Sequence, residues 1–422
     1  MYPLEVMKQE AAKCSRCGVC VALCPVFKEI QRETYSSRGK TEVAKALMEG
    51  DVPYSAYTED LFSKCLVCLA CKGGCPAGVD QSKLVLGVRA ELARRRGLPL
   101  SKRIAFKYLL KNRALFGKLL KAFSFLQMFT PPADGKLRHL PFFLSAFGKG
   151  RLIPNISDTP LRKQFPEVIA PSKGAVTMRV GLFAGCFIDF VDPQIGRSLI
   201  SVLGRHGVEV IFPRRQTCCG TPVFMSGDLQ NGLDLLKMNI EAFAPYELDA
   251  IVTACATCGT ALKESYRVLA EGEGQEWKSR VEAFSAKVLD ISEFLVRKIQ
   301  LTPAETKTLQ KVTYHDPCHL VRGQNVSAQP REIIKSLPGI TLVEMRDAQR
   351  CCGGGGSFSF YNYELSKQIS RRKVENIEAT GASTVITGCP GCMLQLKDQL
   401  GQAGSSVGVK HLIQLVDEAS HS

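Results

Sequence analysis

The sequence predicts a chain of the α/β class, in which a small α-helical unit precedes two copies of a domain built around a parallel sheet. Two observations carry this prediction. All eighteen cysteines fall into two spacing frameworks, eight of them in residues 14–75 and ten in residues 186–392. The ten-cysteine framework consists of two five-cysteine copies separated by 132 to 134 residues, so the C-terminal half is an internal duplication.

The N-terminal unit, predicted over residues 1–95, contains two runs, CSRCGVCVALCP and CLVCLACKGGCP, with a helical insert at residues 41–49 between them. Cysteines at i, i+3 and i+6 can bind three corners of a cubane cluster. These runs resemble those of two-cluster ferredoxins. In that family the fourth ligand of each cluster is the cysteine that precedes proline in the opposite run. The resemblance implies two [4Fe–4S] cubane clusters, with structural zinc and disulfides as the competing interpretations. The implied ligand sets are Cys14, Cys17, Cys20 and Cys75, and Cys65, Cys68, Cys71 and Cys24.

Residues 96–172 are predicted to form a basic helical segment, broken at Gly97 and Pro99, followed by a proline-rich linker. Residues 82–138 hold fourteen basic side chains against two acidic ones, and therefore most of the net charge of +15. Apolar and basic residues interleave from Ser101 to Phe129, as in an amphipathic helix. We expect this stripe to pack between domains or, as the alternative, to contact an anionic membrane surface. Nucleic acid is not an expected partner, because no recognition motif accompanies the charge.

In both C-terminal copies, predicted over residues 173–300 and 301–422, apolar runs of strand length alternate with helical patterns, which is typical of parallel sheets. The expected strands lie at residues 180–185, 208–212, 249–254, 312–316, 341–345 and 383–388. Each precedes a cysteine group, and open α/β sheets bind ligands at the carboxyl ends of their strands. Five sulfurs should therefore converge in each copy. These are Cys186, Cys218, Cys219, Cys255 and Cys258, and Cys318, Cys351, Cys352, Cys389 and Cys392.

Five cysteines are one more than a tetrahedral zinc site or a cubane cluster uses. An adjacent cysteine pair can bridge irons in a larger, irregular cluster, and the glycine after each pair lets the backbone pass close to it. A phosphate-binding loop at Gly353–Gly356 is disfavoured, because no Lys-Ser or Lys-Thr follows. A thioredoxin-like CxxC dithiol would leave three of the five cysteines in each copy unexplained.

The order C…CCG…CxxC, taken twice, resembles the paired CCG domains of the heterodisulfide reductase family, where such a set holds a non-cubane [4Fe–4S] cluster. The whole chain, through segments such as QTCCGTPVFMSGD, HDPCHL and CCGGGGSFSF, is similar to the iron–sulfur subunits of glycolate oxidase, lactate-utilisation proteins and anaerobic glycerol-3-phosphate dehydrogenase. This resemblance implies an N-terminal ferredoxin domain, two CCG domains, and one or two further [4Fe–4S] clusters of cubane or non-cubane type.

The resemblance also implies a role as the electron-transfer subunit of an oxidoreductase complex. An FAD-containing subunit that oxidises lactate or glycolate would donate electrons, and a membrane quinone or an electron-transfer flavoprotein would accept them. No GxGxxG follows a strand, so the chain is not expected to oxidise substrate alone. One alternative is a heterodisulfide-reductase-like subunit that reduces a disulfide at a CCG cluster, and another is a subunit of a membrane complex of sulfur metabolism. We expect a cytoplasmic location, with peripheral contact at the inner face of the membrane as an option.

Four polar side chains stand beside the lone cysteines of the two copies: His315, His319, Asp189 and Asp192. Proton delivery to a cluster or substrate is one interpretation of them. The preferred interpretation is structural, with Asp316 capping a helix whose first turn holds Pro317, and His319 finding a local hydrogen-bond partner. Three lone histidines carry no functional signal: His206, His411 and His421.

Overall fold

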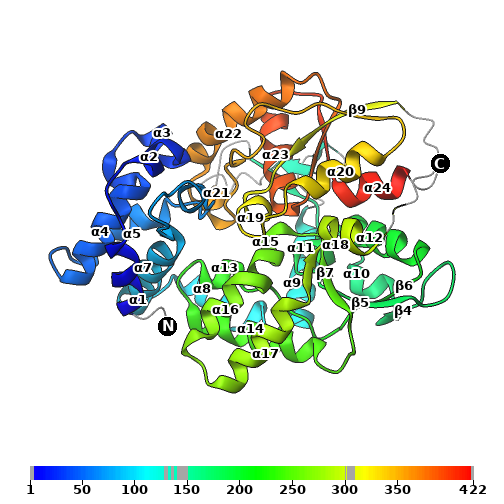
Figure 1. Cartoon of the computed structure of the whole chain (residues 1–422), viewed down its shortest axis with the longest axis horizontal. Helices are drawn as coiled ribbons and strands as arrows, with labels where there is room; N and C mark the ends of the chain where they lie inside the picture. The colour runs from blue at the N-terminus through cyan, green and yellow to red at the C-terminus, as the bar shows by residue number, and fades with distance from the viewer. Residues whose placement is uncertain are drawn as a thin grey trace.

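The computed structural model describes residues 4–127, 132–134, 137–139, 151–299, 301 and 309–419. Figure 1 shows the N-terminal helices at one end of the molecule, beside two sheet-containing domains that lie against each other. The predicted α/β class is confirmed, with a helical N-terminal unit and two parallel-sheet repeats. Pro131 and Pro141 of the predicted linker, and His421, lie outside the described residues.

Helices build the N-terminal unit, and its cysteines lie in the turns between them, except Cys20 and Cys71, which lie within two short helices. The predicted helical insert is confirmed as α4, which begins after Ser36, whose Oγ accepts a hydrogen bond from the Gly39 amide at 2.9 Å. Leu61, Phe62 and Val88 are fully buried at the centre of the unit. The elements are α1 (Leu4–Ala12), α2 (Val19–Leu23), α3 (Pro25–Ile30), η1 (Glu33–Tyr35), α4 (Ser37–Glu49), α5 (Ala56–Ser63), α6 (Ala70–Gly73) and α7 (Gln81–Arg96).

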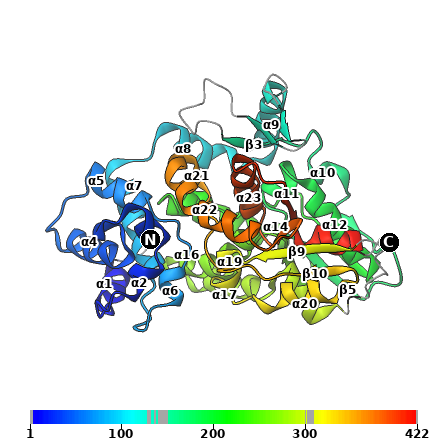
Figure 2. The same ribbon diagram turned by 90° about the horizontal axis from the view of Figure 1, so that it is seen from above.

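The basic segment forms helices that break at Gly97 and Pro99, as predicted, and again before Arg113. In Figure 2, α8 and α9 lie along the upper side of the molecule. The linker region also contains a small antiparallel sheet, β1-β2-β3, that the sequence did not predict. These elements are α8 (Leu100–Ile104), the π-helical turn η2 (Ala105–Leu109), α9 (Arg113–Gln127), β1 (Pro132–Asp134), β2 (Leu137–His139), β3 (Leu152–Pro154) and α10 (Leu161–Gln164).

The first C-terminal domain has a sheet of order β4-β6-β5-β7-β8, parallel except for the edge strand β4. Its strands are β4 (Val168–Ile169), β5 (Met178–Leu182), β6 (Val208–Ile211), β7 (Ala250–Thr253) and β8 (Val288–Asp290). Its helices are α11 (Phe187–Phe190), α12 (Pro193–Arg205), α13 (Thr221–Phe224), α14 (Leu229–Phe243), α15 (Ala256–Thr260), η4 (Ala261–Ser265), α16 (Tyr266–Leu269), η5 (Ala270–Gly272), α17 (Gln275–Ala286) and α18 (Ile291–Lys298).

The second domain repeats this topology with a fully parallel sheet of order β10-β9-β11-β12. All six predicted strands are confirmed, and only the last strand of each sheet, β8 and β12, was missed among the parallel strands. The strands are β9 (Gln310–His315), β10 (Ile340–Leu342), β11 (Thr384–Thr387) and β12 (Gly408–His411). The helices are α19 (Cys318–Val321), α20 (Ala328–Ser336), α21 (Ser357–Tyr361), α22 (Tyr363–Glu378), α23 (Pro390–Gln402) and α24 (Leu412–Ala419).

The N-terminal unit docks mainly on the second domain. His319 Nε2 donates a hydrogen bond to the Val67 carbonyl oxygen at 3.0 Å, and Arg322 donates to that of Cys68 at 3.2 Å. Arg89 makes the matching contact with the first domain, at the Met225 carbonyl oxygen, 2.9 Å away. The cysteine loop at residues 65–69 is therefore held by side chains of a domain about 250 residues further along the sequence.

Candidate metal centres

The eight N-terminal cysteines surround two separate cavities, four sulfurs to each. One cavity, which we call the outer site, is lined by Cys14, Cys17, Cys20 and Cys75. The other, the inner site, is lined by Cys24, Cys65, Cys68 and Cys71. These are the two groups expected from the ferredoxin resemblance. Cys17 is exposed whereas Cys68 is buried, so the outer site reaches the protein surface and the inner site faces the rest of the protein.

Both cysteine loops adopt the same strained backbone. The second residue after the first cysteine has a positive φ in each loop, 58° at Arg16 and 50° at Val67, and so does the fourth, 83° at Gly18 and 61° at Leu69. A β-branched residue such as Val67 rarely adopts a positive φ, and such strain persists where the surroundings impose it, often at functional sites. The repeated conformation curls each loop around its cavity.

Cations line both cavities, and neither lining, as the described residues form it, includes a carboxylate or an imidazole. Arg16 and Arg38 line the outer site, and Lys40 and Lys64 line the inner one. Lys40 is 3% exposed, and its burial lowers the pKa of the ammonium group. Four thiolates around a sulfide-containing iron core are anionic, so these cations fit such a group at both sites.

In the first C-terminal domain the five cysteines follow the strands β5, β6 and β7 and meet at the carboxyl edge of the sheet; we call this set the first CCG site. Cys218, Cys219, Cys255 and Cys258 are buried, and Cys186 is half-buried. Gly220, after the cysteine pair, has a φ of 83°. A Cβ on Gly185 would lie 3.1 Å from the Cys258 sulfur, so the backbone passes close to the sulfurs.

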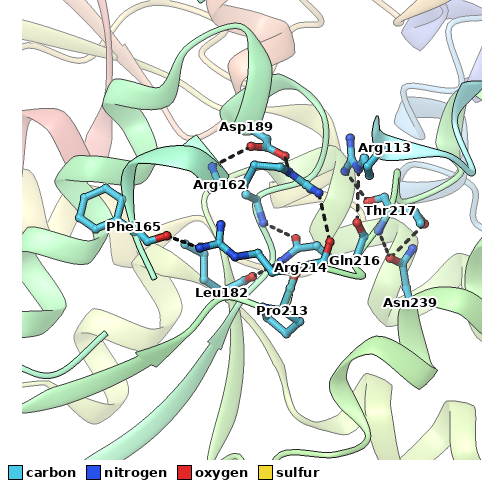
Figure 3. Close-up of polar contacts among 11 residues, drawn as sticks. Arg113, Arg162, Phe165, Leu182, Asp189, Pro213, Arg214, Gln216, Thr217 and Asn239 are labelled. Atoms are coloured by element: carbon cyan, nitrogen blue, oxygen red, sulfur yellow. Dashed lines mark hydrogen bonds and ion pairs between the residues drawn. The ribbon is translucent and has the colours of Figure 1, made fainter. Parts of the chain in front are cut away.

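Buried side chains fix the loop that leads into the cysteine pair of the first CCG site (Figure 3). Arg113 of α9 donates to the carbonyl oxygens of Gln216 and Thr217, at 3.3 and 2.7 Å. Gln216 donates in turn to the Leu182 carbonyl oxygen at the end of β5, and Asn239 accepts from the Thr217 amide at 2.7 Å. The basic segment therefore supports this site directly, which its sequence did not indicate.

The second CCG site repeats the arrangement after β9, β10 and β11. Cys351, Cys352, Cys389 and Cys392 are buried, and Cys318 is half-buried. Gly353 has a φ of 84°, and its amide donates to the Cys351 sulfur at 3.4 Å. A Cβ on Gly353 would clash with Ser370 Oγ at 2.5 Å. Glycine is required here for the turn and for the close packing around the sulfur.

In both CCG sites the second cysteine of the adjacent pair has a lowered pKa, and in the second site the pKa of Cys389 is lowered as well. Hydrogen bonds from Cys218 and Cys258 hold the pKa of Cys219 well below its usual range. Cys351 and Cys392 do the same for Cys352, the second member of the other cysteine pair. Hydrogen bonds with neighbouring thiols, together with burial, raise the pKa of other thiols of the two sites, among them Cys186 and Cys318. Because the thiolate is the metal-binding form of cysteine, the first site favours an anionic sulfur at Cys219 and the second site favours anionic sulfurs at Cys352 and Cys389.

Three of the four cysteine sets, the inner site and the two CCG sites, form a path of neighbouring sulfurs. The inner site meets the second CCG site where Cys68 and Cys351 lie within hydrogen-bonding reach of each other. The two CCG sites meet where Cys255 approaches Cys389 in the same way. All eighteen cysteines are free thiols in this structure. The path runs from the inner site through the second CCG site to the first, and the outer site adjoins the inner one at Ser37, which lies within hydrogen-bonding reach of both Cys20 and Cys71.

The polar residues beside the lone cysteines take different roles. Asp189 is fully buried and forms an ion pair with Arg162 at 2.6 Å (Figure 3), which favours the structural interpretation. His319 bonds to Val67 rather than to a local partner, so the expectation of a local bond was wrong. Asp316 does not cap α19, because Pro317 is the N-cap residue and Asp316 instead binds Arg331 at 2.8 Å. Asp192 precedes α12 and its side chain makes no capping hydrogen bond.

Sequence reasoning missed two buried polar residues at the second CCG site. Lys373 of α22 is fully buried, and its ammonium group donates to the carbonyl oxygens of Asp347 and Ala348 at 2.6 and 3.0 Å. Burial lowers its pKa to about 8, while the nearby Cys351 and Cys352 oppose that shift. His411, at the end of β12, accepts from the Ile413 amide at the start of α24. Nothing in the sequence distinguishes either residue from an ordinary surface position.

The chain resembles known iron–sulfur proteins along nearly its whole length. A cysteine-rich (CCG) domain family matches residues 180–263 and 312–397, and a 4Fe-4S dicluster domain matches residues 10–79. A probable glycolate oxidase iron-sulfur subunit of Bacillus subtilis is 31% identical over 97% of this chain and 94% of its own length. The chain belongs to this family of iron–sulfur subunits. The resemblance stated from the sequence is therefore confirmed.

Two further relatives mark the breadth of the family. Lactate utilization protein A of a Geobacillus species is 33% identical over 57% of this chain and 99% of its own length. A subunit of the fumarate reductase (CoM/CoB) of Methanothermobacter marburgensis is 39% identical over 61% of this chain and 49% of its own length. Among the residues that the structure describes, no helix combines the length and the apolar character needed to cross a bilayer.

Proposed function

We propose that this chain is the iron–sulfur electron-transfer subunit of a flavin-dependent 2-hydroxy acid dehydrogenase complex, with lactate or glycolate as the substrate of the complex. An FAD-containing subunit would donate the electrons, and a quinone or an electron-transfer flavoprotein would accept them. The observation that carries the proposal is the continuous path of sulfurs across three domains. The names of the glycolate oxidase and lactate utilization relatives support it.

We assign the outer and inner sites one [4Fe–4S] cubane cluster each, and each CCG site a further [4Fe–4S] cluster of cubane or non-cubane type. Such clusters supply one-electron oxidation and reduction when bound. The protein supplies the thiolates, the cations around them and the exclusion of water. Exposed Cys17, with Arg16 beside it, offers one surface for a partner, and half-buried Cys186 lies at the other end of the path. The proposed location is cytoplasmic.

The chain and its complex should behave differently in an activity assay. Purified chain with its metal bound should not oxidise lactate or glycolate with an artificial acceptor, whereas the chain with an FAD-containing partner should. Substrate oxidation by the chain alone, at the rate of the complex, would contradict the subunit assignment. A complex in which the substrate reduces the flavin but not the iron–sulfur centres would contradict the relay.

A second candidate is a heterodisulfide-reductase-like subunit, and two observations favour it. All ten CCG cysteines are present, and the two CCG sites lie side by side at Cys255 and Cys389. The relationship to the CoM/CoB fumarate reductase of the methanogen points the same way. Turnover of a heterodisulfide with reduced viologen as electron donor would support this candidate over the dehydrogenase subunit, and absence of turnover in an iron-replete sample would remove it.

A further inference from the structure

A buried histidine at the second CCG site has no hydrogen-bond partner. His315 is the last residue of β9 and is fully buried; the Ala348 carbonyl oxygen lies near its ring, but neither ring nitrogen makes a hydrogen bond of normal geometry. Its ligand nitrogen and the sulfurs of Cys352 and Cys392 all lie within 4.8 Å of one another. Within the described part of the chain, no other group of three or more potential metal ligands comes this close together. The arrangement places an imidazole among the candidate cluster ligands.

The duplication provides an internal comparison for this position. His315 lies three residues before Cys318, and Phe183 lies three residues before Cys186. His315 pairs with Thr387 on the neighbouring strand β11, and Phe183 donates its amide to Val252 on the corresponding strand β7. Phe183 is fully buried and stacks on Phe243, with ring centroids 6.2 Å apart. The fold therefore accepts an apolar ring here, and packing alone does not explain the histidine.

The two unpaired nitrogens make the histidine costly unless something binds them. Leaving one buried polar group without a partner costs about 1–3 kcal/mol. Imidazole nitrogen bonds iron and zinc at about 2.0 Å and thiolate sulfur bonds zinc at about 2.3 Å, so small side-chain rotations would bring all three donors to a common metal. The donor set of the second site would then differ from that of the first by one nitrogen.

We propose that His315 supplies a nitrogen ligand to the metal centre of the second CCG site, and that the first site has no such ligand. The neutral imidazole donates the lone pair of one nitrogen to iron, alongside Cys352 and Cys392. No electron is transferred in forming this bond. The inference rests on the proposed cluster-binding role of the second cysteine set, and it makes the two duplicated sites chemically different.

The test is pulsed electron paramagnetic resonance on anaerobically prepared full-length protein in which histidine alone carries ¹⁵N. In a Cys219→Ser background, which removes the first CCG site, the signal of the second site should show hyperfine coupling to a histidine nitrogen. The coupling should disappear in His315→Phe, which copies the residue of the first domain, with the iron of the second site retained. The matched control is His411→Gln, which should keep the coupling.

The outcomes separate this proposal from the function on which it rests. If the protein that retains His315 gives a second-site signal without coupling to a histidine nitrogen, the proposal that His315 is a ligand is contradicted. The cluster-binding role of the second site would still stand. Coupling that survives His315→Phe, or is lost only in His411→Gln, would also overturn it. If His315→Phe does not fold, the labelled His315 protein still decides the matter. Absence of any second-site iron would instead contradict the cluster-binding role itself.

Discussion

The two CCG domains share one scaffold but differ in what surrounds their sulfurs. The first site is supported from outside its domain by Arg113 of the basic segment, whereas the second contacts the inner site through Cys351. His315 and Lys373 accompany the second site, and Phe183 takes the place of His315 in the first. Both copies of the duplication thus keep the same five cysteines, while the residues around them differ, and the second site lies between the inner site and the first site.

The largest expected effect comes from breaking each site at its equivalent cysteine. Cys352→Ser should lower substrate-driven turnover of the complex by about 100-fold or more, because the second site joins the inner site to the first. This loss exceeds the one typical of substituting a residue that only hydrogen-bonds to a metal ligand. Cys219→Ser should leave the inner and second sites reducible by the flavoprotein. Iron analysis and spectroscopic titration of both variants check this. Equal reduction of the first site in Cys352→Ser and unsubstituted protein would contradict the order of the path.

Removal of the buried carboxylates beside the two sites should have unequal effects on stability. Asp189→Ala leaves Arg162 buried without its partner, so the free energy of unfolding should fall by about 3–5 kcal/mol. Asp316→Ala in the second domain should cost less, because Arg331 keeps its ion pair with Glu344 at 2.7 Å. Chemical denaturation of the two variants measures the difference. Equal losses of unfolding free energy in the two variants would show that the ion pair with Glu344 does not compensate for the loss of Asp316.

The last strand of each sheet ends in a buried helix-capping residue, Asp290 in the first domain and His411 in the second. Burial raises the pKa of Asp290 to about 7. Between pH 4 and about 7 the unfolded chain has lost this proton while the folded protein keeps it, so this group lowers the stability as pH rises. Asp290→Asn should flatten that fall in denaturation measurements from pH 5 to 7.5. An unchanged pH dependence would mean that Asp290 is ionised throughout this range.

The helix α9 of the basic segment packs on the first domain, and its two faces differ. Phe116 packs edge-to-face on Phe190 at 5.2 Å, whereas Leu115 and Leu119 are 40% and 46% exposed. The expected packing face is therefore present, and the other face, with Lys118 and Lys121, remains available for an anionic membrane. We predict flotation with anionic vesicles when the flavoprotein is present, weakened by about 1 kcal/mol per residue in Lys118→Gln and Lys121→Gln. Equal flotation with neutral vesicles would contradict the electrostatic contribution.

The cysteine spacing and the apolar runs were sufficient to predict the fold class, six of the parallel strands and the groups of sulfurs that converge. Those features depend on local sequence and on the rule that ligands collect at the carboxyl edge of a sheet. The strands β8 and β12 were missed because they are three and four residues long, and in β12 only Val409 has an apolar side chain. The small antiparallel sheet was missed because its strands contain prolines, which argue against strands.

Contacts between domains could not be predicted from the sequence. The bonds of His319 to Val67 and of Arg113 to Thr217 join residues 252 and 104 positions apart, and no local pattern marks either partner. The expected cap at Asp316 was wrong for a related reason, since the half-buried Arg331 of α20 binds the Asp316 carboxylate. Long-range pairing of this kind decides which cysteine sets become neighbours.

The central claim, that four sets of thiolates hold iron–sulfur clusters in one chain, is tested most directly by iron and acid-labile sulfide analysis of anaerobically purified protein. Four irons and four sulfides are expected for each filled set, with both CCG sites contributing beyond the two ferredoxin clusters. Cys219→Ser and Cys352→Ser should each remove one set's share. Iron below the content of two cubane clusters per chain, or stoichiometric zinc in its place, would contradict the account.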